Sequence, residues 1–475
     1  MENFKPSSEH NLYNSDLKPK TEDEKTIKPS GYGVVWFGMA VQLSCFVSLS
    51  PMVNYFTIGQ FILVLVIGST LLGFLSFIAQ DIGVKYGISF AVSVSATYGY
   101  LGGKIINLVR ILPSLFFFGL AAYIGAVALN EIFKMAFGFE NLILSLILNV
   151  VVTVAITLKK LKIIEKVLFF IAPILVAVSI YMLYVVLSAY DVSFVEIFSM
   201  GKLKGENAPI TMWLFGFAAA AGGFTSVTLG MNDFTNECKN VNNSNKWFQG
   251  NYKYSIAALI GLVPAYTFVA VVGAVTIALS GRMDALVVIS ELVQERSIFL
   301  AIVLQLFIVL AQMATNAPAN LMPSAYAVSA LLPKKVSYKL ALFVFAALSF
   351  LVIPLAIGGS ANTILSLFSA TTGPAMAIVG VDYYVFKRRT LNLNEIYNSE
   401  GKYRYFKGVN ILGLVIYVVT SLMGLLFQDI SFFVATILAA CLYYLVGKIF
   451  KKKYPVMLTE KNDSSSMDSE KGAVL

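Results

Sequence analysis

Charged residues are scarce in this chain: Asp, Glu, Lys and Arg make up 13% of its 475 residues, whereas a soluble domain carries about 25%. The one histidine, His10, lies in a polar N-terminal stretch. The three cysteines are widely spaced, which argues against a disulfide framework and a cysteine-based metal site. Since the sequence shows no Ser/His/Asp set, metal-ligand set or glycine-rich phosphate loop, an enzyme is the least favoured class of function.

Long apolar runs take the place of charge, and hydrophobic residues account for 58% of the chain. A membrane-spanning helix needs about 20 mostly apolar residues, and residues 167–187 and 210–232 contain no charge at all. The pattern predicts an all-α polytopic membrane protein of about twelve transmembrane helices. We place them at residues 33–56, 58–80, 104–130, 141–158, 164–189, 210–232, 251–280, 297–316, 338–357, 361–385, 408–427 and 430–449.

Lysine and arginine gather in every second connection between these helices. Cytoplasmic connections are the ones that carry this excess, so the pattern predicts a plasma-membrane protein with both termini in the cytoplasm. The net charge of +9 therefore reflects orientation in the lipid bilayer, and we do not expect nucleic acid as a partner. The basic residues concerned are Lys85; Lys159, Lys160, Lys162 and Lys166; Lys239, Lys246 and Lys253; Lys334, Lys335 and Lys339; Lys387, Arg388, Arg389, Lys402, Arg404 and Lys407; and Lys448, Lys451, Lys452 and Lys453.

The ends of the chain are polar. No apolar segment of the signal-peptide type precedes the first predicted helix, so we expect no cleaved signal. Residues 1–30 and the Ser-rich residues 451–475 predict disordered cytoplasmic tails. Between them we expect transmembrane helices 1–9 over residues 31–357 and transmembrane helices 10–12 over residues 358–450.

The first and sixth predicted helices contain residues that disfavour a continuous helix. Helix 1 holds Gln42, several serines and Pro51, and helix 6 holds the run Ala-Ala-Ala-Ala-Gly-Gly at 218–223. An inverted repeat of five plus five helices would place a matching pair of interrupted helices here, with backbone groups exposed near the bilayer midplane to bind a solute or an ion. Small residues equally suit close helix packing, and the sequence leaves both interpretations open.

Buried amides are concentrated in the eighth predicted helix and its continuation. Gln312, Asn316 and Asn320 recur at intervals of four residues and would share one face of a helix, with Pro318 producing a kink. Gln42 is a further amide in the first helix. Because an amide both donates and accepts hydrogen bonds, this set suits the edge of a uracil- or hydantoin-like ring. Hydrogen bonding between helices is the alternative interpretation for each of these residues.

Other polar and aromatic groups narrow the mechanism. The aromatic run 116–118 in helix 3 suits stacking on a planar ring, although lipid contact or core packing explains any one of these residues as well. No Asp or Glu lies in the middle of a predicted helix, which disfavours a relay of buried carboxylates. A coupling cation would therefore bind carbonyl and hydroxyl oxygens.

Arg110 suits either a carboxylate partner or an extended side chain reaching the headgroups, and we favour the second.

Motifs spaced along residues 14–410 carry a family resemblance. In their order and spacing they resemble the nucleobase–cation symporter family 1, which includes transporters of hydantoin, allantoin, uracil and cytosine. The motifs are residues 14–19 and 36–39, residues 85–90 followed by 98–99, residues 232–235, residues 315–316 with Asn320, residues 382–384 with 387–389, and residues 397–403.

The resemblance implies a fold of five plus five inverted-repeat helices, with helices 1 and 6 broken and two further helices at the C-terminal end, that works by alternating access. It implies that a heterocyclic solute binds between helices 1, 6, 3 and 8. No bound cofactor is implied beyond the coupling ion. The substrate-binding positions carried over to this sequence are Gln42, Phe117, Ala121, Gly223, Phe224, Asn316 and Asn320.

This sequence departs from the hydantoin-type members at several of these positions. Phe117 and Phe224 stand where those members carry tryptophan, and Ala121 stands where they carry glutamine. Loss of that amide predicts a preference for a solute other than hydantoin or allantoin, one that is larger or less polar at one edge.

The implied sodium site has a departure of its own. It would use the carbonyls of Gly38, Val41 and Ala311 and the hydroxyl of Thr315, whereas the other hydroxyl position of the family is occupied here by Ala314. The coupling ion is therefore either sodium or a proton, with sodium slightly favoured. An amino-acid or vitamin-precursor transporter of the same architecture and a channel remain alternative functions.

Overall fold

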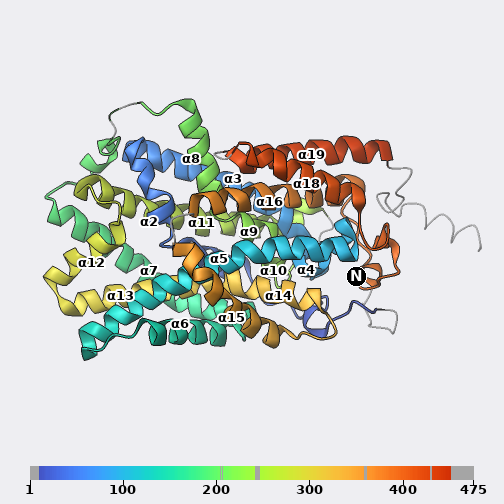
Figure 1. The fold of residues 1–475 in the computed structure, drawn as a ribbon, viewed down its shortest axis with the longest axis horizontal. Coiled ribbons are helices and arrows are strands. Elements are labelled where there is room, and N and C mark those ends of the chain that lie inside the picture. Colours follow the sequence, from blue (N-terminus) through green and yellow to red (C-terminus); the bar gives the residue numbers. More distant parts are fainter. Residues whose placement is uncertain are drawn as a thin grey trace, which may run out of the picture.

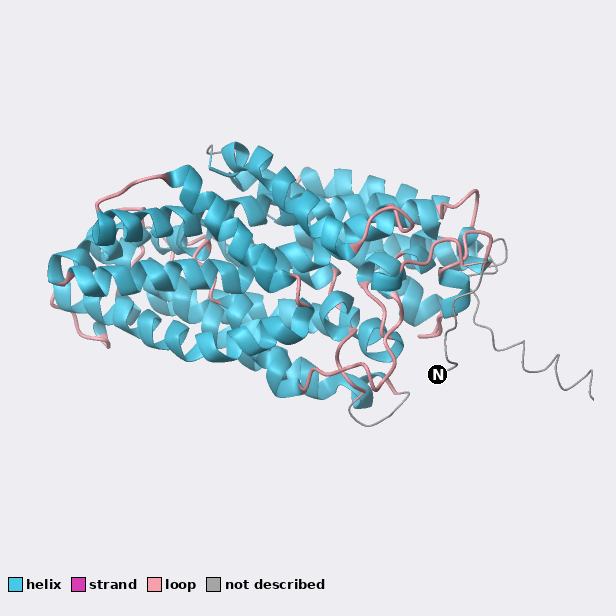
Figure 2. Ribbon diagram, turned by 90° about the horizontal axis from the view of Figure 1, so that it is seen from below, coloured by secondary structure: helices cyan, strands magenta, loops and turns pink. Residues whose placement is uncertain are grey.

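The computed structural model describes residues 10–203, 205, 207–240, 246–357, 361–427 and 430–450, and these form an elongated bundle of helices (Figures 1 and 2). Both ends of the described chain lie at the same end of the bundle (Figure 1). The helices of the twelve or so membrane-spanning segments are α1 (Pro29–Ala40), α2 (Cys45–Ser48), α3 (Ile58–Tyr86), α5 (Ser95–Phe137), α6 (Leu142–Thr157), α7 (Lys160–Ala189), α8 (Ile210–Gly222), α9 (Thr225–Leu229), α10 (Asn232–Thr235), α11 (Trp247–Ser280), α13 (Ile298–Asn316), α14 (Met322–Leu331), α15 (Tyr338–Ile357), α16 (Ala361–Val381), α18 (Ile411–Leu425) and α19 (Ser431–Phe450). Shorter helices in the connections are α4 (Phe90–Ser93), α12 (Ala285–Arg296) and α17 (Leu393–Ile396).

The breaks predicted in the first and sixth spanning segments are confirmed. Helix α1 ends at Ala40, because Val41 takes φ −76° and ψ 62°, and α2 begins at Cys45. Helix α8 ends at Gly222 and α9 begins at Thr225. The last carbonyls of α1 and α8 therefore have no partner further along their own helices, as at any helix end. The two breaks supply backbone polar groups inside an otherwise apolar bundle.

Two spanning segments extend well beyond their predicted ends. Helix α5 has 43 residues, with a change of direction at Gly99, where φ is +80°. The eighth segment passes from α13 through a π-helical turn, Ala317–Leu321, into α14, so Pro318 is accommodated without ending the helix. The extra turns carry polar residues such as Thr97 and Ser324, which are buried in the protein. A hydropathy pattern does not indicate these turns, because it detects apolar residues and these turns carry buried polar ones.

The spanning helices pack around a centre formed by the breaks. Helix α1 lies against α11 and α7, and α13 lies against α5. Helices α18 and α19 pack on each other and on α16 at one side of the bundle (Figure 1). These last two helices therefore lie outside the central group.

Residues 10–28, which we expected in a disordered tail, are folded against one end of the bundle. The side chain of Lys25 is fully buried and donates to the Val84 carbonyl at 2.5 Å. Further along, the Ile27 amide donates to the Glu237 carbonyl, and the Asn14 side chain donates to the Val336 carbonyl. The tails at 1–9 and 451–475 lie outside the described residues. The connections after the second, sixth and eighth segments therefore share one end of the bundle with the N-terminal segment.

The favoured interpretation of Arg110 is wrong. Its guanidinium is 2% exposed and forms an ion pair with Asp233, which is fully buried in α10. Asp233 also accepts a hydrogen bond from the Phe90 amide at 2.9 Å. The bare backbone of Gly230 makes room for the arginine, since a Cβ there would lie 1.8 Å from a guanidinium nitrogen. Because the Arg110 guanidinium is buried and paired with a carboxylate, its side chain does not extend to the headgroups.

Candidate functional site

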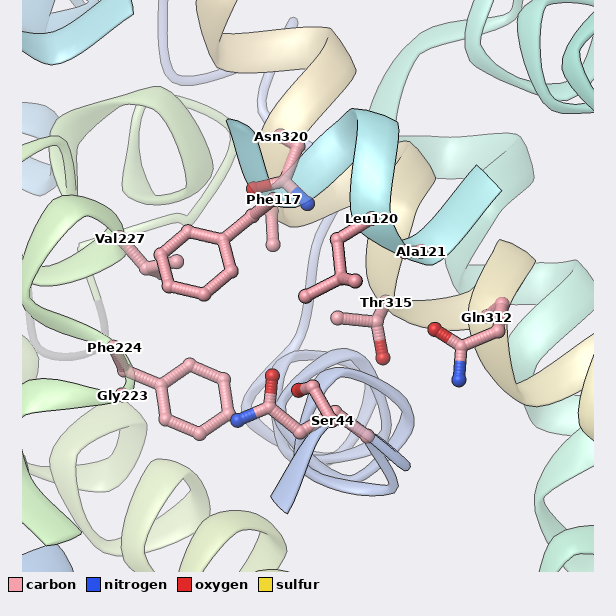
Figure 3. A pocket seen from close by; sticks show the side chains of 12 residues that line it. Ser44, Phe117, Leu120, Ala121, Gly223, Phe224, Val227, Gln312, Thr315 and Asn320 are labelled. Atoms are coloured by element: carbon pink, nitrogen blue, oxygen red, sulfur yellow. The ribbon is translucent and has the colours of Figure 1, made fainter. Parts of the chain in front are cut away.

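A cavity of about 420 Å³ lies where the two broken segments meet α5 and α13 (Figure 3). It combines aromatic rings with side-chain amides and is otherwise lined by small or aliphatic groups. Its lining residues are Gln42 and Ser44 from the first break; Phe117, Leu120 and Ala121 from α5; Gly223, Phe224 and Val227 from the second break; and Gln312, Thr315, Ala319 and Asn320 from the eighth segment. A pocket of this composition suits a flat, partly polar molecule.

The rings of Phe117 and Phe224 lie on the same side of the cavity and come from different helices (Figure 3). Phe224 stands in the break between α8 and α9 and is held by Trp36, with ring centroids 6.2 Å apart, and by Tyr266 at 5.3 Å. Phe117 lies edge to face with Phe116 at 5.7 Å. Aromatic faces attract planar rings by stacking. The fixed Phe224 and the less buried Phe117 thus offer two aromatic surfaces to one ligand.

Gly223 is required by its neighbours. A Cβ at this position would lie 2.6 Å from the Tyr266 hydroxyl and 3.6 Å from the Gln42 amide nitrogen. The Gln42 amide and the Tyr266 hydroxyl thus lie on the same side of the second break. The glycine therefore lets the polar end of Gln42 come close to the backbone of the second break, beside the Phe224 ring.

Asn316 and Asn320 have different positions, although the sequence pattern treated them alike. Asn320 lines the cavity, whereas Asn316 does not belong to its lining. The Asn316 amide donates to the Phe118 carbonyl at 3.0 Å, and its oxygen accepts from the Asn320 amide at 2.7 Å. The π-helical turn between them changes the phase of the helix, so a spacing of four does not keep both side chains on one face. Asn316 holds Asn320 in place from behind.

Six of the seven expected substrate positions line one cavity: Gln42, Phe117, Ala121, Gly223, Phe224 and Asn320. The expectations for this site did not include Ser44, Leu120, Val227 and Ala319. Leu120 lies next to Ala121 in the chain, but no feature of the sequence distinguishes it from lipid-facing leucines. Gln312, which also lines the cavity, had a signal, because it belongs to the amide series of the eighth segment.

Of the expected cation ligands, Thr315 lies at the contact between α1 and α13. The Thr315 hydroxyl donates to the Met39 carbonyl at 3.2 Å, and so lies at the open carbonyl end of α1. Gly38 allows α7 to approach, since a Cβ there would lie 2.8 Å from a Leu168 methyl. Ala311 is fully buried in α13.

The fifth position in this group contributes no oxygen. Ala314 lines a separate apolar cavity of about 280 Å³ between α6, α7 and α13. Among the described residues, no cluster of three or more His, Cys, Asp or Glu is placed to hold a metal ion. A cation at this place would be bound by carbonyl and hydroxyl oxygens, which are the ligands that hard ions prefer.

Comparisons with known proteins give consistent matches over nearly the whole chain. Residues 19–447 match the family model described as a permease for cytosine/purines, uracil, thiamine and allantoin. The hydantoin permease of Microbacterium maritypicum is 31% identical over 447 residues, covering 94% of this chain and 91% of its own length. The allantoin permease of Bacillus subtilis (strain 168) is 24% identical over 470 residues, covering 92% and 93% of the two chains.

Solved structures match as completely. Mhp1, a nucleobase-cation-symport-1 family transporter in a closed conformation with bromovinylhydantoin bound, superposes with a TM-score of 0.89 at 30% identity, covering 94% of this chain and 97% of Mhp1. The inward-facing conformation of Mhp1 gives a TM-score of 0.83 at 31% identity, covering 96% and 98%. The described structure is therefore more similar to the closed conformation than to the inward-facing one.

Proposed function

The chain belongs to the nucleobase–cation symporter family 1, and from this premise we propose that it imports a flat nucleobase-like or hydantoin-like heterocycle together with a cation. As a member, it is a multi-pass membrane transporter and not an enzyme. The observation that carries the proposed substrate class is the cavity at the two helix breaks, in which the aromatic rings of Phe117 and Phe224 accompany the amides of Gln42 and Asn320.

The proposed binding mode follows from the chemistry of these groups. A planar ring stacks on Phe117 and Phe224, and its polar edge bonds to Gln42 and Asn320. One of the two Asn320 amide hydrogens bonds to Asn316, so the Asn320 oxygen and its second N–H are available to the polar edge of a ring. Leaving buried polar groups unpaired costs free energy, so such a site discriminates against rings that lack the matching edge.

The proposed coupling ion is sodium, bound between α1 and α13. The Thr315 hydroxyl already bridges the two helices through Met39, so an ion there would favour the arrangement in which they are held together. Four of the five expected oxygen positions remain, with Ala314 as the exception. A ligand shifts a conformational equilibrium only through different affinities for the two states. A proton is the competing coupling ion.

We further propose that the end of the bundle bearing the N-terminal segment faces the cytoplasm. The basic connections after the second, sixth and eighth segments lie at this end, as the excess of lysine and arginine on the cytoplasmic side requires. Release of solute to the cytoplasm then requires this end to open, and the Arg110–Asp233 pair joins α5 to α10.

Uptake into proteoliposomes tests the function. The purified chain is reconstituted, and uptake of labelled uracil, cytosine, hypoxanthine, hydantoin and allantoin is measured with and without a sodium gradient at constant pH gradient. The proposal expects saturable uptake of at least one heterocycle that stops when sodium is removed. Uptake that persists without sodium and follows the pH gradient would replace sodium by a proton. Uptake of none of these rings, with uptake of an amino acid, would overturn the substrate class.

A further inference from the structure

We infer that Gln312 and Ala121 form an end subsite of the cavity, which hydrogen-bonds an acceptor atom on the far edge of a bicyclic or ring-substituted heterocycle. This inference rests on the proposed function and narrows its substrate class. It assigns a role in specificity to Gln312, which is not among the substrate positions that the family resemblance carries over.

Gln312 is the unusual amide of the cavity. Its side chain is 2% exposed, and its Nε2 has no hydrogen-bond partner. Asn320, another amide of the lining, donates by contrast to Asn316. Buried polar groups in native proteins are nearly always hydrogen-bonded, and an exception needs an explanation. A ligand that accepts a hydrogen bond from Gln312 supplies that explanation.

The position of Gln312 sets the length of such a ligand. In Figure 3 its side chain lies across the cavity from the rings of Phe117 and Phe224, beyond Thr315. A single six-membered ring stacked on the two phenyl groups therefore leaves the far amide unsatisfied. A ligand that contacts both places has to extend along the cavity, as a fused second ring or a ring substituent does.

Ala121 gives this extension room. It lines the cavity from α5 and presents only a methyl group. A longer side chain at position 121 would project into the same cavity and compete with the ligand for that space. The short residue and the unpaired amide, one on each of two facing helices, thus describe one subsite: a small space with a hydrogen-bond donor at its wall.

The chemical class follows from the donor. An N–H requires an acceptor, which is a carbonyl oxygen or an unprotonated ring nitrogen. Fused purine-type rings carry such acceptors at both ends and are longer than uracil, which is a single ring. We therefore expect preference for the bicyclic ring.

The test is competition binding to the purified full-length chain, with hypoxanthine and uracil as the two probes. Gln312→Met keeps the length of the side chain and removes the donor. Gln305→Met is the matched control, because Gln305 lies two turns earlier in α13, outside the cavity lining, and bonds to Ser290 at 3.3 Å. Ala121→Gln fills the subsite from the other side.

The expected result is a wild-type preference for hypoxanthine of about tenfold, the scale of one well-placed hydrogen bond in a buried site. Q312M and A121Q should reduce this preference to less than about threefold by lowering the affinity for hypoxanthine relative to uracil, while Q305M keeps the wild-type ratio. A wild-type preference for uracil, or equal losses for both probes in Q312M, would overturn the inference while leaving the proposed function standing. Binding of neither probe, with no uptake of any heterocycle, would overturn the proposed function itself.

Discussion

The side chain of Asn320 donates a hydrogen bond to the Oδ1 of Asn316 at 2.7 Å, across the turn where α13 passes into a π-helix. Asn316 in turn donates to the Phe118 carbonyl of α5 at 3.0 Å. This short chain of hydrogen bonds joins the two helices that flank the cavity and orients the Asn320 amide. One asparagine is therefore a candidate ligand, and the other positions it.

The two asparagines are expected to differ when each is replaced by alanine. Asn320→Ala removes the polar group offered to the ring, so uptake should fall about 10- to 100-fold while the thermal midpoint Tm changes little. Asn316→Ala leaves the Phe118 carbonyl and Asn320 without their partner, so it should lower Tm as well as uptake. Initial uptake rates in proteoliposomes and Tm in detergent are measured for both variants. Wild-type uptake by Asn316→Ala would contradict the positioning role.

Phe117 is the cleaner probe of stacking, because Phe224 also packs on Trp36 and Tyr266. Phe117→Ala should weaken solute binding by about 1–3 kcal/mol, the range found for aromatic–base stacking. Phe117→Trp should retain binding, since it keeps an aromatic face. Equilibrium binding of a labelled heterocycle measures both. Equal losses in Phe117→Ala and Phe117→Trp would show that shape, and not stacking, matters at this position.

The proposed sodium site predicts opposite changes in sodium dependence for substitutions at two neighbouring residues. Thr315→Val removes a hydroxyl that lies at the carbonyl end of α1, so the sodium concentration for half-maximal uptake should rise by about tenfold. Ala314→Ser restores the missing oxygen, so that concentration should fall. Uptake is measured against sodium concentration at constant ionic strength, with choline as the replacement ion. Sodium dependence unchanged in both variants would move the ion elsewhere.

The Arg110–Asp233 pair should stabilise the closed arrangement of the end that bears the N-terminal segment. Asp233→Ala leaves a buried guanidinium without its carboxylate, and such a loss costs about 3–5 kcal/mol. Replacing both residues by apolar ones, Arg110→Met with Asp233→Leu, should recover most of the stability, since a hydrophobic pair of similar volume avoids the desolvation of two charges. Thermal unfolding of the single and double variants measures this. A double variant no more stable than the single one would show that the Phe90 amide, and not Arg110, is the partner that matters.

Some features followed from the sequence because their causes are local. Glycine and polar residues inside apolar runs marked both helix breaks, since a helix loses stability at such residues wherever the rest of the chain lies. The resemblance also named six residues that line the cavity. Asn316 does not line the cavity, because its side chain bonds to the Phe118 carbonyl and to Asn320, and the spacing of four did not indicate these partners.

The amino-acid sequence by itself determined that this protein spans a membrane many times, because the transfer of about 20 apolar residues into lipid is favourable segment by segment. For the first and sixth segments it left two interpretations open, and the structure decided in favour of interrupted helices. Only the tertiary structure decided that Arg110 pairs with Asp233, 123 residues away, that residues 10–28 are folded, and that Gln312 enters the cavity without a partner. These features depend on which segments pack together. The role of a buried charge or amide depends on the groups that surround it in the folded protein, and the local sequence does not specify these groups.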